Sequence, residues 1–195
     1  MMRRLASLHR ARSGSTAIEF AILAPVFLMT LMGLLELGYQ TYISSVLDGA
    51  MNDAGRSSTL EDGASQVNNI DQRVKDRILE MAPGATFESS RKAYSNFADV
   101  GKPEPFNDLN GDGVRDENEC YEDINGNGAF DLDRGKDGQG GADDIVNYTM
   151  TVTYPPIVPL GKLIGWSSSN TASATTVLRN QPFGNQAIPN VECKT

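Results

Sequence analysis

The chain of 195 residues has one histidine and two cysteines, too few for most catalytic or zinc-binding arrangements. The histidine, His9, lies in a basic N-terminal segment, so the rest of the chain has no imidazole for acid–base catalysis. Neither Cys120 nor Cys193 belongs to a Cys-x-x-Cys pair, which argues against a zinc site. The sequence also lacks a Gly-x-Ser-x-Gly nucleophile motif and a phosphate-binding loop. We therefore expect that the protein is not an enzyme.

Basic residues are scarce outside the N-terminal segment. The formal net charge is −8, although the first 14 residues carry four arginines and no acid. The remainder is therefore more acidic than the total indicates, and we expect it to repel nucleic acid. Its many carboxylates are the oxygen ligands that calcium prefers.

A long apolar run follows the basic segment. Residues 20–35 carry no charge and are mostly apolar, and the apolar character extends on both sides, which is enough to span a bilayer as a helix. The preceding arginines place the N-terminus in the cytoplasm and the acidic part outside the inner membrane. The run is too long for a signal peptide and has no small-residue cleavage site on its far side, so we expect a retained anchor. Glu36, near the outer interface, is expected to be solvated or to snorkel.

Periodicity predicts the remaining elements. Apolar residues at spacings of three and four continue the first helix as an amphipathic stalk from Tyr39 to Ala54 and predict a second helix over 65–82. Residues 145–154 alternate, with five large side chains on one face, and predict a strand; weaker strands are expected over 85–100 and 171–178. The predicted fold class is α+β: a long N-terminal transmembrane and stalk helix, a second amphipathic helix and a small antiparallel β-sheet, with an acidic calcium-loop insertion. The expected parts are a leader (1–14), the transmembrane and stalk helix (15–56) and a periplasmic domain (57–195) that contains the insertion (99–144).

The insertion holds fourteen acids and four bases, a composition typical of disorder, but its residue order is that of calcium loops. The stretch DLNGDGVRDENE supplies side-chain oxygens at alternating positions, a glycine for the turn, a backbone carbonyl and a terminal glutamate. The predicted ligands of this first loop are Asp108, Asn110, Asp112, Val114, Asp116 and Glu119.

A second loop begins 15 residues later with DINGNGAFDLD. Its twelfth position is Arg134, so a neighbouring acid has to complete the ligand set. The predicted ligands are Asp123, Asn125, Asn127, Ala129, Asp131 and Asp133. Neither loop is flanked by predicted helices, so both look like the helix-free calcium repeats of extracellular proteins. The alternative is a solvated turn region without a specific ion.

The two cysteines are candidates for a disulfide, because an anchor of this orientation places both in an oxidising compartment. Two free thiols are the alternative, since the sequence does not show that Cys120 and Cys193 approach each other.

The N-terminal sequence resembles a known family. Gly14 followed by STAIEF, after a basic leader, resembles the prepilin peptidase site of type IV pilin-like proteins. The stretch GSTAIEFAILAPVFLMTLMGLLELG is similar to the TadE-like family of minor pilins, or pseudopilins, of tight-adherence (Tad/Flp) pili, and NYTMTVTYPP and ASATTVLRNQP resemble the ends of those proteins. The resemblance implies cleavage by a membrane-embedded prepilin peptidase between Gly14 and Ser15. It also implies as partners other pilins, minor pilins and an inner-membrane assembly platform.

Cleavage at that site gives Glu19 a role. An acid in a bilayer costs about 2.5–3.5 kcal/mol at the helix centre, less near an interface, and usually has a partner. The new amine of Ser15 is such a partner, with an unperturbed pKa of about 8. Glu19 can pair with the amine of its own chain or with that of a neighbouring subunit, and the resemblance favours the neighbour. The alternative is an acid at headgroup level without a specific partner.

Two functions remain open at this point. The first is a minor pilin or pseudopilin that is anchored in the inner membrane, processed, and active in pilus assembly and so in surface adhesion. The second is an uncleaved, signal-anchored periplasmic calcium-binding module that recruits a partner.

Overall fold

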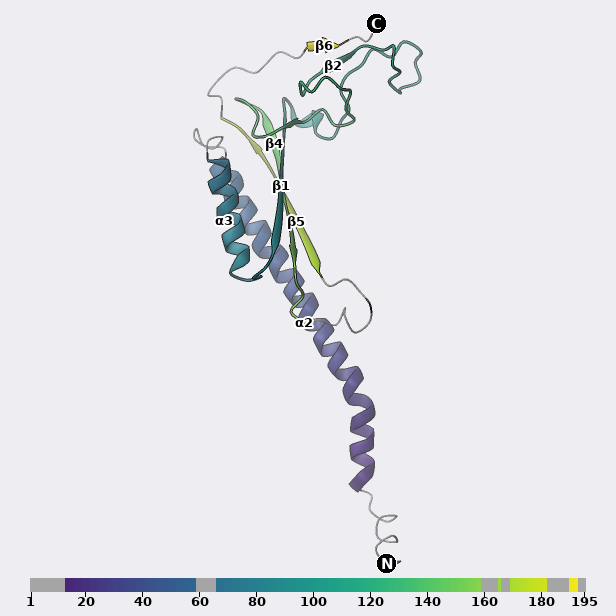
Figure 1. The fold of residues 1–195 in the computed structure, drawn as a ribbon, viewed down its shortest axis with the longest axis vertical. Coiled ribbons are helices and arrows are strands. Elements are labelled where there is room, and N and C mark those ends of the chain that lie inside the picture. The colour runs from purple at the N-terminus through teal and green to yellow at the C-terminus, as the bar shows by residue number, and fades with distance from the viewer. Residues whose placement is uncertain (1–12, 59–65, 159–164, 166–168, 182–189, 193–195) are drawn as a thin grey trace, which may run out of the picture. The chain divides into compact units, whose positions relative to one another are not determined.

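A computed structural model describes residues 13–58, 66–158, 165, 169–181 and 190–192 (Figure 1). The chain forms two compact units. Met1–Tyr42 and Pro156–Ser169 form one, which we call the stem unit, and Ile43–Pro155 and Asn170–Thr195 form the other, the sheet unit. The division within the first helix follows Tyr42, whereas the predicted domain boundary follows residue 56. The predicted leader, 1–14, lies almost entirely outside the described residues.

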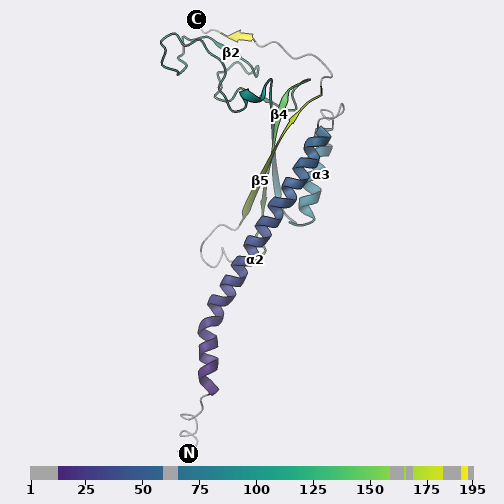
Figure 2. The ribbon, with the colours of Figure 1, turned by 180° about the vertical axis from the view of Figure 1, so that it is seen from behind.

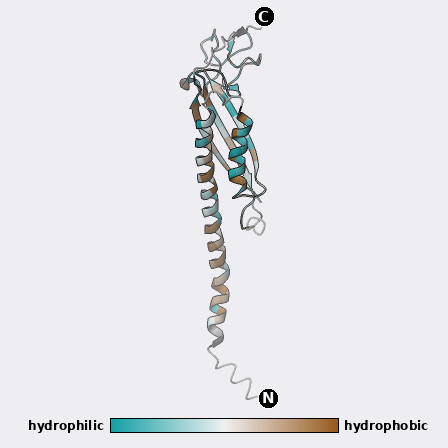
Figure 3. Ribbon diagram, turned by 90° about the vertical axis from the view of Figure 1, so that its left-hand side faces the viewer, coloured by the Kyte–Doolittle hydropathy of each residue, from teal (hydrophilic) through white to brown (hydrophobic). Residues whose placement is uncertain are grey.

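Helix α2, Ser13–Ser58, is the longest element. Pro25 lies inside it, where its ring removes one backbone hydrogen bond without ending the helix. From residue 16 onward α2 is long and apolar enough to cross a membrane, and its most apolar stretch is not buried by the rest of the protein. Figure 3 shows the hydrophobic colouring of this stretch. Such a surface on a folded chain favours contact with lipid or with another apolar helix.

The sheet unit contains helix α3, Val67–Leu79, and a four-stranded antiparallel sheet of order β3-β1-β4-β5. Its strands are β1 (Thr86–Tyr94), β3 (Lys136–Asp137), β4 (Ile145–Tyr154) and β5 (Asn170–Arg179). A separate ribbon pairs β2, Tyr121–Asp123, with β6, Asn190–Glu192, and a short 3-10 helix, η1, covers Phe97–Asp99. Strand β4 confirms the strand that the alternation predicted over 145–154. The combination of two helices and an antiparallel sheet confirms the predicted α+β class.

The core lies between the sheet and the two helices, which pack on the same face (Figures 1 and 2). Strand β4 buries every second side chain, and α2 and α3 bury residues at helical spacing. The close approach of α2 to β5 depends on Gly55, because a Cβ atom there would lie 3.1 Å from the Thr176 hydroxyl. The core residues of β4, α2 and α3 are Val146, Tyr148, Met150, Val152, Tyr154, Ile43, Leu47, Met51, Ile70, Val74 and Ile78.

The ends of the predicted elements differ from those observed. Helix α3 ends at Leu79, so Met81, expected on its apolar face, is exposed. The strand expected over 85–100 ends at Tyr94, because the chain turns into η1. Strand β5 matches the expected 171–178 within one residue at each end.

The alternation in β4 makes a direct prediction for stability. We expect Met150→Ala to lower the free energy of unfolding by about 2–5 kcal/mol, because it leaves a cavity at a fully buried position. The neighbouring Thr151→Ala, on the other face, should change it by less than about 0.5 kcal/mol. Urea unfolding of the full chain in detergent, followed by near-ultraviolet circular dichroism, measures both. Equal effects of the two substitutions would contradict the assigned core face.

Candidate functional site

The predicted processing site lies in the first turn of α2. Gly14 and Ser15 are helical, and Glu19 follows one turn after Ser15. Glu19 is exposed, as are its neighbours Ile18, at 64%, and Phe20, at 72%. The segment thus presents one carboxylate within an apolar helical surface.

Glu36 was predicted to be solvated or to snorkel, but the structure gives it a hydrogen-bond partner in the protein. It is only half-exposed, and its Oε2 accepts a hydrogen bond from the backbone N–H of Val158 at 3.1 Å. Both residues belong to the stem unit. The carboxylate therefore ties α2 to the connection between β4 and β5.

The first acidic loop folds inward around its own side chains. The Asp108 carboxylate accepts hydrogen bonds from the backbone N–H groups of Gly111, at 2.6 Å, and Gly113, at 2.9 Å. Both glycines have positive φ values, of 77° and 75°, a conformation that side chains disfavour. The Asn110 amide donates to Asp112 and Asp116 at 3.1 Å each, which brings these three side chains together.

Glu119 closes this loop from its twelfth position. It is only 1% exposed. Its Oε1 accepts the N–H of Leu109, the second position, at 2.8 Å, and its Oε2 accepts the N–H of Asp116, the ninth, at 2.9 Å. All of the first loop's predicted side-chain ligands thus lie in one hydrogen-bonded unit.

The second loop repeats this geometry 15 residues later. Asp123 accepts hydrogen bonds from the N–H groups of Gly126, at 2.7 Å, and Gly128, at 2.9 Å. The amides of Asn125 and Asn127 both donate to Asp131 Oδ2, at 2.7 and 2.5 Å. The side chain of Asn127 also accepts the N–H of Ala129 at 2.7 Å.

The second loop is closed by Glu104, which the sequence analysis missed. Glu104 is 1% exposed, and its Oε1 accepts the N–H of Ile124 at 2.8 Å, while its Oε2 accepts the N–H of Asp131 at 3.1 Å. Ile124 and Asp131 are the second and ninth positions of this loop, so Glu104 makes the same two contacts as Glu119 in the first. A glutamate from before both loops occupies the role of the missing twelfth residue.

Asp133, predicted to complete the second loop, is placed elsewhere. Its carboxylate accepts hydrogen bonds from Lys92 Nζ, at 2.7 Å, and from the Tyr94 hydroxyl, at 3.0 Å, both on β1. Although burial acts to raise the pKa of Asp133, the hydrogen bonds from Lys92, Gly135 and Tyr94 lower it. Burial, with the hydrogen bond to Asp133, raises the pKa of Tyr94 to about 12. Asp133 therefore fastens the insertion to the sheet.

No three Asp, Glu, His or Cys side chains among the described residues are arranged as a ready metal site. Several of the predicted ligands are asparagine side chains or backbone carbonyls, which lie outside these four residue types. Most of the clustered carboxylates accept backbone N–H groups, whereas Asp116 and Asp131 accept asparagine side-chain amides. A carboxylate has about four acceptor positions in total. The donor set of both loops, all oxygen, still fits calcium in its chemistry.

Cys120 precedes β2 and is disulfide-bonded. Cys193, its predicted partner, lies outside the described residues. The pairing of β2 with β6 begins at Tyr121 opposite Glu192, the sequence neighbours of the two cysteines. The predicted pairing therefore stays a prediction, and this register favours it.

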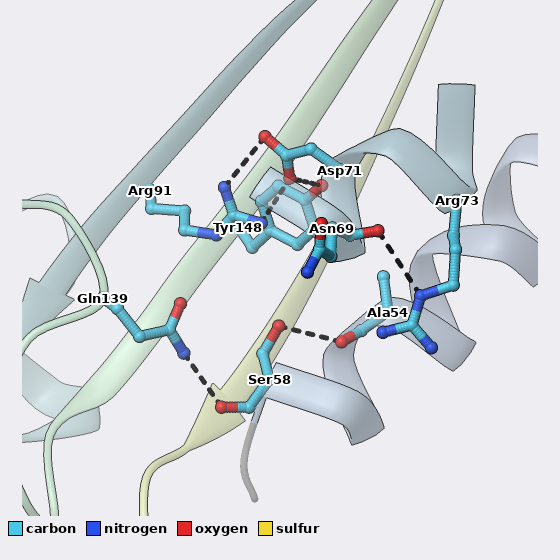
Figure 4. Close-up of polar contacts among 8 residues, drawn as sticks. All are labelled: Ala54, Ser58, Asn69, Asp71, Arg73, Arg91, Gln139 and Tyr148. Atoms are coloured by element: carbon cyan, nitrogen blue, oxygen red, sulfur yellow. Dashed lines mark hydrogen bonds and ion pairs between the residues drawn. The ribbon is translucent and has the colours of Figure 1, made fainter. Parts of the chain in front are cut away.

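A buried ion pair, also missed from the sequence, joins α3 to the sheet (Figure 4). Arg91 on β1 donates to both carboxylate oxygens of Asp71 on α3, at 2.5 and 3.2 Å, and the Tyr148 hydroxyl on β4 donates to Asp71 at 2.6 Å. The Arg91 guanidinium lies 3.7 Å from the centre of the Tyr148 ring. Burial opposes ionisation of Asp71, but the bonds from Arg91 and Tyr148 outweigh it, so the pKa of Asp71 is lowered.

We expect Arg91→Met to lower the free energy of unfolding by about 3–5 kcal/mol, because it leaves a buried carboxylate without its cation. Lys92→Met is the matched control: its pair with Asp133 is about one-third exposed, and its loss should cost at most about 1 kcal/mol. Urea unfolding at pH 7 measures both. Similar losses in the two variants would contradict the role given to Arg91.

Acid should weaken the same contact. Because the folded pKa of Asp71 is below its unfolded value, its stabilising contribution is complete above the unfolded value and is lost as the pH falls through the folded one. Asp71→Asn should therefore be less stable than the parent chain at pH 7, and the difference should shrink toward pH 3. A constant difference would exclude this linkage.

Comparison with known proteins finds one family that the N-terminal part of the chain resembles. Residues 14–56 match the family model described as TadE-like protein, which confirms the resemblance seen in the sequence. The match begins at Gly14 and runs through nearly all of α2. No curated protein and no solved structure matches the chain.

Proposed function

We propose that the protein is a minor pilin or pseudopilin of a Tad-type pilus, because its N-terminal helix matches the TadE-like family model. The family match associates the chain with these pili, and α2 has the length and composition of a membrane anchor. The observation that carries the finer proposal is that the match begins at Gly14, the predicted cleavage site. In this role the protein is not an enzyme but the substrate of one, the prepilin peptidase.

Processing turns the first turn of α2 into an assembly contact. Cleavage after Gly14 removes the basic leader and leaves Ser15 with a positive amine, one turn before Glu19. Since Glu19 is exposed between apolar side chains, the amine of a neighbouring pilin can neutralise it within lipid. Such a pair fixes the axial register of packed helices, and the inner-membrane assembly platform supplies the neighbours. The acidic sheet unit then lies in the periplasm, with the N-terminus cytoplasmic.

Two measurements test this mechanism. Mass spectrometry of the membrane-extracted protein should find Ser15 as the first residue. Glu19→Ala should leave membrane insertion intact and reduce the number of pili at least about tenfold, the effect of losing about 1.4 kcal/mol from a contact. Asp48→Ala, an exposed acid on α2 beyond the apolar run, is the control and should assemble normally. A mature chain that keeps residues 1–14 would instead support the anchored calcium-binding module.

We further propose that both acidic loops bind calcium outside the cytoplasm. The first loop contributes Asp108, Asn110, Asp112, Asp116, Glu119 and the Val114 carbonyl, and the second contributes Asp123, Asn125, Asn127, Asp131, the Ala129 carbonyl and Glu104. Glu104 takes the place first given to Asp133, because it makes the contacts that Glu119 makes in the first loop. A bound cation offsets the repulsion among these carboxylates and so stabilises the insertion.

Calorimetry on the full chain in detergent should detect two calcium sites with Kd values of about 10⁻⁴–10⁻³ M, the range of extracellular modules. Glu104→Gln should abolish one site and Glu119→Gln the other. Glu117→Gln, an exposed acid of the first loop, is the control and should keep both. Absence of calcium-dependent heat would refute the proposal, and two intact sites in Glu104→Gln would refute the role of Glu104.

A further inference from the structure

The two acidic loops contact each other through the same position of their repeat. Counted from Asp108 and Asp123, the eighth residues of the first and second loops are Arg115 and Phe130. The guanidinium of Arg115 lies 5.3 Å from the centre of the Phe130 ring, which is within the range of a cation–π contact. In each loop the next residue, the ninth, is a predicted ligand whose backbone N–H donates to the closing glutamate. A contact between the loops therefore lies one residue from a predicted ligand of each.

A small aromatic cluster surrounds this contact. The Phe130 ring meets the rings of Phe106 and Tyr121 edge to face, with ring centres 5.8 and 5.7 Å apart. The Arg115 guanidinium also lies over the Tyr121 ring, at 4.7 Å from its centre. Phe106 precedes the first loop, Tyr121 follows it, and Phe130 belongs to the second loop. Because edge-to-face pairs stabilise packing beyond the area they bury, displacement of either loop disturbs the packing of the other.

The backbone links the two loops a second time. Glu104, which closes the second loop, lies four residues before Asp108, which begins the first. The segment between them pairs with the residues that follow the first loop, through a β-bridge between Phe106 and Tyr121 and two backbone hydrogen bonds of 2.8 and 2.9 Å. A change in the position of Glu104 is therefore transmitted to the start of the first loop.

We propose that Arg115 and Phe130 are positioning residues that couple the two calcium loops, so that calcium in one loop raises the affinity of the other. The inference rests on the proposed calcium binding. Ordering of either loop fixes its eighth residue, and the stack then holds the eighth residue of the other loop in place. The second loop therefore loses less conformational entropy on binding than the first, which produces positive cooperativity. Coupling of this kind typically changes an affinity by about 5–150-fold.

The glycines at the sixth position report on each loop separately. The N–H of Gly113 donates to Asp108 and that of Gly128 to Asp123, at 2.9 Å each. Calcium is added to the full chain in detergent, with isotopically labelled glycine, and both N–H signals are followed by nuclear magnetic resonance. We expect the two signals to shift at the same calcium concentrations, with a Hill coefficient of about 1.4 or more, the value for fivefold coupling of two equal sites.

Substitutions at the contact test its role. Phe130→Ala should separate the two transitions, and Arg115→Gln, which removes the cation but leaves the rings, should lower the Hill coefficient. Phe130→Tyr keeps the ring and should retain the cooperativity of the parent chain. Leu132→Ala is the matched control and should also retain it, because Leu132 is a large apolar residue of the same loop that is 79% exposed. Cooperativity that survives in Phe130→Ala or in Arg115→Gln would overturn the role given to the contact.

The same titration distinguishes loss of coupling from loss of calcium binding. Separate, non-cooperative transitions of Gly113 and Gly128 in the parent chain would overturn the coupling and leave the proposed calcium binding intact. A response of only one of the two glycines would also overturn the coupling, because a single site has no partner. Glycine signals that do not move with calcium would refute calcium binding itself, and the coupling with it.

Discussion

Continuity of α2 is the constraint on which the rest of the structure depends. One helix presents an exposed apolar surface in its first half, which we propose faces lipid, and supplies Ile43, Leu47 and Met51 to a protein core in its second half. A helix that is apolar all round suits the first task, and a helix with one apolar face suits the second. The sequence meets both demands by changing from continuous apolar residues to residues spaced three and four apart. The proposed packing of stems and the folding of the sheet unit therefore draw on the same element.

Elements with strong periodicity could be predicted from the sequence, because each buried position in such an element requires an apolar side chain. The five alternating side chains of β4 are buried as predicted, and so are Ile70, Val74 and Ile78 of α3. At the two ends of the predicted helix, Val67 is partly exposed and Met81 is exposed. Contacts between distant polar residues could not be read this way. Asp71 looks like a solvated residue on an amphipathic helix, and nothing near it in the chain indicates that Arg91 will meet it across the core.

The acidic loops show the same limit within one motif. The residue order predicted where the oxygens of each loop gather, because those contacts are local and depend on glycines at fixed spacing. The residue that closes the second loop could not be predicted from the calcium-loop pattern. That pattern covers only the residues that follow Asp123, whereas Glu104 precedes both loops. Asp133 is one residue short of the closing position, and Lys92 and Tyr94 of β1 offer it a cation and a hydroxyl, which the loop does not.

The buried carboxylates of Asp71, Glu104 and Glu119 are compensated in two physically different ways. Asp71 has a fixed cation, Arg91, so its negative charge is neutralised within the fold. In the described part of the chain, Glu104 and Glu119 form no ion pair; their oxygens accept backbone N–H groups. Dipoles satisfy the hydrogen-bonding capacity of a carboxylate but leave its net charge, and an uncompensated buried charge costs several kcal/mol. The same deficit on two glutamates in equivalent positions is the reason to expect that a mobile cation completes the two loops.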